Sequence, residues 1–175
     1  FSKVQIFNAK ANIELRKFLA YAHNQQKEEA YESLILRKSY AQQAMGLMEV
    51  DEVRQRDFDS INTRMEAWYH ILFGEYNKAE EKLAKLHSIV SNIQSPTALD
   101  DYSAMLGMVH LFRGDPNGAI GYFNENINTE NYQYYSYFKA LALRGSGQED
   151  SATEIFQQLA NYNFNSLGSS LVRSK

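Results

Sequence analysis

The chain has 175 residues, of which 44% are hydrophobic and 13% aromatic, enough for a folded core and too many for a disordered chain. Its formal net charge is −3, which argues against a dedicated nucleic-acid-binding protein because such proteins carry a basic excess. The lack of cysteine excludes disulfides, thiolate metal sites and a cysteine nucleophile, and no apolar stretch is long enough to cross a membrane.

Apolar residues recur every three or four positions along most of the chain, a spacing that predicts helices. One stripe covers residues 4–22 and a second covers 31–48, with Lys38 as the one polar interruption of the second stripe. A third helical segment follows over residues 50–73, for which a break near 57–62 is left open. Since no run of alternating β-branched residues is long enough for a strand, we predict an all-α protein.

Two prolines indicate where later helices begin. Ser95-Pro96 and Asp115-Pro116 each place a capping side chain before a proline, which is favoured at the first helical position. Asparagine-rich stretches at 124–131 and 161–165 predict turns. Each boundary therefore separates two predicted helices.

Both ends of the sequence are expected to be cuts. Residue 1 is Phe, and no basic and apolar signal segment opens the chain. Residues 165–175 have the pattern of another helix that stops. We therefore expect a piece of a longer or processed protein, and its compartment is left open.

An internal repeat of four positions runs through the second half of the chain. In each copy a small residue precedes a glycine, an alanine follows, and a large apolar residue comes last, at near-constant spacing. The copies are Ala67, Gly74, Ala79 and Leu83; Gly107, Gly114, Ala119 and Phe123; and Ala140, Gly147, Ala152 and Phe156. Small residues allow two antiparallel helices to approach closely, glycine allows the turn between them, and the large residue fills the next layer.

The segments 67–83 and 106–123 resemble the tetratricopeptide repeat family, and residues 137–156 resemble it more weakly. The resemblance implies antiparallel helix hairpins that stack as a right-handed solenoid. It also implies a role in binding other proteins, because the first helix of each hairpin in this family lines a concave groove.

The resemblance sets the expected organisation of the chain. Residues 60–175 are predicted to hold the repeats, in copies over about 60–98, 99–131 and 132–165, followed by the start of a C-terminal helix. Residues 1–59 are predicted to form an N-terminal helical hairpin that caps the array, or else a degenerate repeat.

No catalytic or cofactor signature is recognisable in the sequence, so we predict a protein that is not an enzyme and that has no cofactor and no metal. Ser136 and Lys139 have the spacing of a Ser–Lys nucleophile pair but lack the companion motifs. His70 and His110 occupy equivalent repeat positions, where a two-histidine metal or pH-sensing site is conceivable. Packing between helices is the favoured role for both rings.

The repeat alignment places a set of mainly methionine and aromatic side chains on the predicted groove. These candidates are Arg64, Met65, Trp68, Asp101, Met105, Met108, Phe112, Tyr134, Tyr137, Phe138 and Arg144. Such a lining suits an apolar peptide or an amphipathic helix, because methionine adapts its shape and aromatic rings bury a large area.

The sequence therefore predicts a non-catalytic scaffold that binds a protein or peptide partner and neither nucleic acid nor the membrane interior. Two alternatives stay open. In the first alternative, the chain's own segments or a second copy in a dimer fill the groove. In the second, the chain is a regulatory or sensor segment of a larger signalling or transcription protein.

Overall fold

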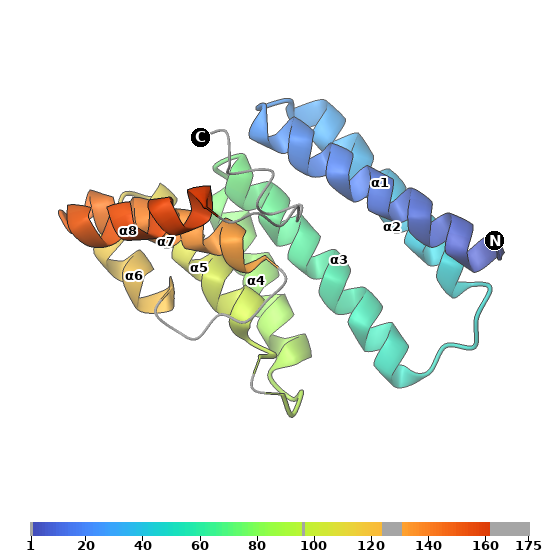
Figure 1. The fold of residues 1–175 in the computed structure, drawn as a ribbon. Helices are drawn as coiled ribbons and strands as arrows, with labels where there is room; N and C mark the ends of the chain where they lie inside the picture. Colours follow the sequence, from blue (N-terminus) through green and yellow to red (C-terminus); the bar gives the residue numbers. More distant parts are fainter. Residues whose placement is uncertain (1, 96, 124–130, 162–175) are drawn as a thin grey trace. The chain divides into compact units, whose positions relative to one another are not determined.

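The computed structural model describes residues 2–95, 97–123 and 131–161, which form eight α-helices and no strand (Figure 1). The helices are α1 (Lys3–His23), α2 (Lys27–Met45), α3 (Glu52–Leu72), α4 (Tyr76–Val90), α5 (Asp100–Phe112), α6 (Pro116–Phe123), α7 (Tyr132–Gly145) and α8 (Glu149–Ala160). The all-α prediction is confirmed. Within this part of the chain, no helix combines the length and apolar character needed to span a membrane. The helix predicted after residue 165 lies outside the described residues.

The chain divides into two compact units, residues 1–89 and residues 90–175. The predicted division fell earlier, between residues 59 and 60. The observed division comes later because α3 packs against both α1 and α2, so that most of the first repeat copy belongs with the N-terminal hairpin.

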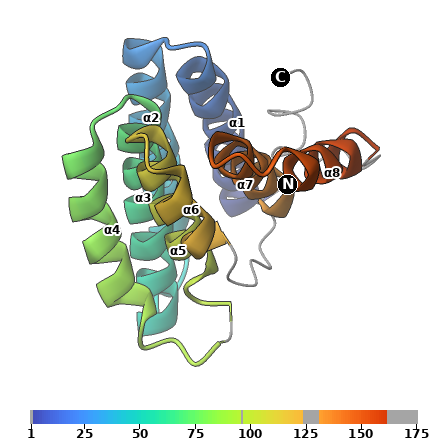
Figure 2. The ribbon, with the colours of Figure 1, turned by 90° about the vertical axis from the view of Figure 1, so that its left-hand side faces the viewer.

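The first unit is built on the antiparallel pair α1 and α2, which lie side by side along their length (Figure 1). Phe18 of α1 and Ala30 of α2 are both fully buried. Helix α3 runs without interruption, so the break considered near residues 57–62 does not occur. It starts at the cap residue Asp51, whose side chain accepts a hydrogen bond from the Arg54 backbone N–H at 2.8 Å. Helix α4 runs beside α3 (Figure 2).

In the second unit α5 packs against α6 and α7, and α8 packs against α7. Helix α6 begins as predicted, with Pro116 as its first residue and Asp115 accepting a hydrogen bond from the Gly118 N–H at 2.9 Å. Helix α5 begins at Asp100, and residue 96, the predicted first helical position, lies outside the described residues. Ahead of the helix, the Ser95 hydroxyl accepts a hydrogen bond from the Thr97 N–H at 3.4 Å.

The three repeat glycines lie in the turns of three helical hairpins, and these turns have the same geometry. Gly74, Gly114 and Gly147 have φ values of 72°, 85° and 81°, a left-handed conformation in which glycine is unstrained. After each glycine, a backbone N–H donates to the carbonyl five positions earlier, the hydrogen bond that defines a Schellman motif. The stacking of these hairpins as a right-handed solenoid stays a prediction.

The hairpin of α1 and α2 uses the same turn with a different residue. Gln25 has a φ of 61°, and the Gln26 N–H donates to the Tyr21 carbonyl at 2.9 Å. Ala30 follows Gln25 at the spacing at which Ala79 follows Gly74, and both alanines are 0% exposed. This geometry agrees with the degenerate repeat left open for residues 1–59, although glutamine stands where the other turns have glycine.

Candidate functional site

Six of the eleven side chains predicted to line a groove are buried in the protein. Met65, Trp68, Met105, Met108, Tyr134 and Phe138 are each 0% to 5% exposed. Methionine and aromatic residues at helical spacing serve as core here, as the contact between the Tyr134 and Phe138 rings, with centroids 4.9 Å apart, illustrates. Burial removes these six from the predicted groove surface.

The other five predicted residues keep some exposure. Arg64, Asp101, Phe112 and Tyr137 are half-buried, and Arg144 is exposed. Several of them have partners within their own unit: the Tyr135 hydroxyl donates to Asp101 at 2.9 Å, and the Arg144 guanidinium lies 5.5 Å from the centre of the Phe156 ring.

The two repeat histidines each contact an acidic residue of their own turn. His70 Nδ1 lies 2.6 Å from Glu75 Oε2, and His110 Nδ1 lies 2.9 Å from Asp115 Oδ2. Within the described ranges, no three histidine, aspartate or glutamate side chains are grouped closely enough to hold a metal ion. In both hairpins the histidine and acid link the end of one helix to the start of the next.

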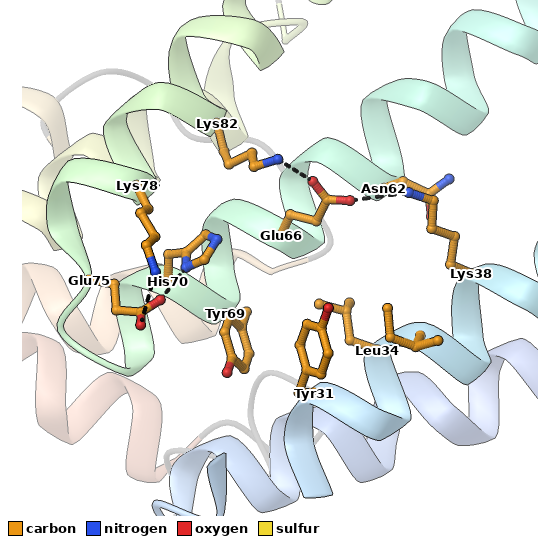
Figure 3. A pocket seen from close by; sticks show the side chains of 11 residues that line it. Tyr31, Leu34, Lys38, Asn62, Glu66, Tyr69, His70, Glu75, Lys78 and Lys82 are labelled. Atoms are coloured by element: carbon orange, nitrogen blue, oxygen red, sulfur yellow. Dashed lines mark hydrogen bonds and ion pairs between the residues drawn. The ribbon is translucent and has the colours of Figure 1, made fainter. Parts of the chain in front are cut away.

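A pocket of about 420 Å³ in the first unit brings together side chains from α2, α3 and α4 (Figure 3). Helix α2 contributes Tyr31, Leu34, Ile35 and Lys38; α3 contributes Asn62, Glu66, Tyr69 and His70; and the turn and start of α4 contribute Glu75, Lys78 and Lys82. We call it the tyrosine–lysine pocket. Its volume is in the range of natural ligand sites.

One wall of the tyrosine–lysine pocket is apolar and open to solvent. Tyr31 and Ile35 lie one helical turn apart on α2 and are 53% and 49% exposed. The Tyr31 ring stands 5.7 Å from the ring of Tyr69, whose hydroxyl has a raised pKa because of burial (Figure 3). Large exposed apolar side chains next to a pocket are common at binding surfaces.

The opposite wall holds charged side chains. Glu66 accepts from Lys82 at 2.8 Å and from Lys38 at 3.2 Å (Figure 3). Burial acts to raise the pKa of this carboxyl, but the two lysine hydrogen bonds outweigh it and lower the pKa. Glu66 therefore stays ionised at neutral pH.

Glu75 is the second carboxylate of the pocket, and it contacts three cationic or titratable groups. Lys27 donates to it at 2.9 Å, His70 lies 2.6 Å away and Lys78 lies 3.4 Å away. The hydrogen bonds from Lys27 and then His70 lower the pKa of Glu75 to about 2. Three lysines of the lining, Lys38, Lys78 and Lys82, thus face the two carboxylates, which leaves an excess of one positive charge on the pocket in a chain whose net charge is −3.

None of the predicted groove residues lines this pocket, which uses another face of α3. Positions 62, 66, 69 and 70 face the pocket, whereas the prediction chose 64, 65 and 68. One sequence feature could have indicated the pocket. Lys38 lies within the apolar stripe of α2, and a charged side chain at such a position is expected where the buried surface of the helix ends.

Comparison of the chain with protein-family models, with curated proteins and with solved structures gives no match. The resemblance to tetratricopeptide repeats therefore depends on the three sequence copies alone.

Proposed function

We propose that the protein is a non-catalytic binding module that holds, in the tyrosine–lysine pocket, a peptide segment with both acidic and apolar side chains. The observation that carries this proposal is the juxtaposition of the exposed pair Tyr31 and Ile35 with a local excess of lysine. The proposed role in binding a protein partner is the one expected from the sequence, but the proposed binding surface is the tyrosine–lysine pocket and not the predicted groove.

The chemistry of the two walls defines the ligand. Apolar side chains of a peptide would pack against Tyr31 and Ile35 and remove them from water. Its carboxylates would contact the lysines, whose side chains are 30% to 63% exposed and so keep room for a second partner. Charge complementarity of this kind selects acidic over basic segments.

The charged groups of the pocket support binding more than catalysis. Since the pKa values of Glu66 and Glu75 are both lowered, neither carboxyl holds a proton to donate at neutral pH. Among the described residues that line the pocket there is no serine, threonine or cysteine to act as a nucleophile.

The test is selection from a display library of random short peptides on the immobilised 175-residue chain. We expect enriched peptides to combine aspartate or glutamate with leucine, phenylalanine or tyrosine. Lys78→Glu should reduce the affinity for an enriched peptide about tenfold, because it removes one attractive charge and adds a repulsive one. The control is Lys85→Glu, the same charge change on α4 outside the pocket, which should leave the affinity unchanged.

Three results would contradict the proposal. Enrichment of basic peptides would show that the lysine excess does not select the ligand. Equal loss of affinity in the Lys78→Glu and Lys85→Glu variants would show a long-range effect of net charge. Protection of the pocket by dimerisation of the chain, with no peptide selected, would show that a second copy is the occupant.

A further inference from the structure

A second pocket, of about 460 Å³, lies in the first unit between α1, α2 and the beginning of α3. Met45, the last residue of α2, and Met48, which follows the helix, line it, and α3 adds Phe58. Two guanidinium groups, those of Arg37 and Arg54, also line it, and we call it the arginine pocket. It has no lining residue in common with the tyrosine–lysine pocket.

Arg37 is half-buried beside a neutral partner. Its Nη1 donates to the Asn62 amide oxygen at 2.6 Å, and no carboxylate in the described part of the chain forms an ion pair with it. Burial, and then the nearby positive charge of Arg64, lower the pKa of Arg37 to about 10. A partly desolvated cation beside another cation favours a bound anion, since the anion would offset the cost of burial.

The other charged groups of the arginine pocket leave its excess charge positive. The side chain of Arg54 donates to the Glu49 backbone carbonyl at 2.6 Å, which is a neutral acceptor. Asp57 is the carboxylate on the lining, and it lies 3.6 Å from Arg56, outside the pocket. Two arginines against one aspartate leave room for one negative charge from a ligand.

The walls around these charges determine the rest of the ligand. Methionine side chains are flexible and polarisable and adapt to unbranched apolar chains. Ala41 and Ala44 on the same face of α2 keep the pocket wide. A guanidinium group binds a carboxylate through two parallel hydrogen bonds.

We propose that the arginine pocket binds a small amphipathic carboxylate, with the carboxylate on Arg37 and an unbranched apolar chain against Met45 and Met48. This site shares no lining residue with the proposed peptide site, and the Arg37–Asn62 hydrogen bond joins the two linings. Its ligand is a free monocarboxylic acid of medium chain length.

The five methionines of the chain allow a direct test. The chain is labelled with ¹³C at the methionine methyl groups and titrated with octanoate, with octanol and with acetate. We expect saturable shifts of the Met45 and Met48 signals with octanoate. The buried Met65, Met105 and Met108 should not shift. Octanol lacks the charge and acetate lacks the chain, so each should bind at least about tenfold more weakly.

Arg37→Gln tests the role of the guanidinium and should weaken octanoate binding about tenfold. Arg16→Gln, an exposed arginine on α1 outside the pocket, is the matched control and should bind as the wild type does. Equal affinity for octanol and octanoate on the wild-type chain would overturn the proposal, even if Arg37→Gln does not fold. Unchanged octanoate affinity in a folded Arg37→Gln variant would overturn it too, and so would shifts of all five methyl signals together.

Discussion

Helices α2 and α5 both carry an apolar stripe, but the two stripes differ in their exposure to solvent. On α5, Met105 and Met108 are 0% exposed, since the helix packs against α6 and α7. On α2, Tyr31 and Ile35 are about half exposed, and Lys38 of the same stripe forms an ion pair with Glu66 of α3. The comparison shows that two apolar stripes of similar sequence pattern differ in exposure, because one is covered by neighbouring helices and the other is not.

Truncation of a side chain in each stripe should give the largest contrast between the two helices. Met108→Ala should lower the free energy of unfolding by about 2–5 kcal/mol, because it leaves a cavity in a packed core. Ile35→Ala should change it by no more than about 0.5 kcal/mol, because the side chain is 49% exposed. Urea unfolding followed by circular dichroism measures both values, and similar losses in the two variants would contradict the distinction.

The close packing of α5 on α6 can be tested by adding a methyl group. A Cβ atom at Gly107 would lie 2.9 Å from Cζ of the Phe123 ring, so Gly107→Ala should destabilise the protein by about 1–3 kcal/mol. Gly107→Leu should destabilise it further. At Gly121 on α6 a Cβ atom would meet nothing within 4 Å, so Gly121→Ala should stabilise the helix by about 0.5–1 kcal/mol. Thermal unfolding of the pair checks the sign of each change, and a gain at Gly107 would mean that the hairpin is looser than described.

The turns that precede α2 and follow α5 offer the smallest and most specific comparison. Gln25 adopts a left-handed conformation without the freedom of glycine, so Gln25→Gly should stabilise the protein by up to about 1 kcal/mol. Gly114→Ala reverses the change in the α5–α6 turn and should destabilise by a similar amount. Chemical denaturation of both variants measures the difference, and a loss of stability in Gln25→Gly would show that the glutamine side chain contributes more than the strain costs.

Local features of the fold could be predicted from the sequence because they depend on residues close together in the chain. The cap at Asp115-Pro116 and the turns at Gly74, Gly114 and Gly147 formed where the sequence indicated. The N-terminal hairpin was predicted without the position of its turn, since the backbone at Gln25 adopts the Schellman geometry without the usual glycine.

The candidate site could not be predicted because it depends on contacts between distant residues. Glu66 bonds Lys38 and Lys82, and nothing in the spacing of these residues indicates that three helices bring them together. For the same reason the methionines of α5 were predicted to line an open groove. Periodicity shows which face of a helix is apolar but not which other segment covers that face.

The most direct test of the proposed site is the affinity of a library-selected acidic and apolar peptide for two variants whose unfolding is measured in parallel. The double variant Tyr31→Ser, Ile35→Ser removes the exposed wall of the tyrosine–lysine pocket, and Met108→Ala removes a side chain of the predicted groove. We predict that the double variant stays folded and loses the peptide, while the folded fraction of Met108→Ala binds it as the wild type does. Binding lost in folded Met108→Ala and kept in the double variant would contradict the account.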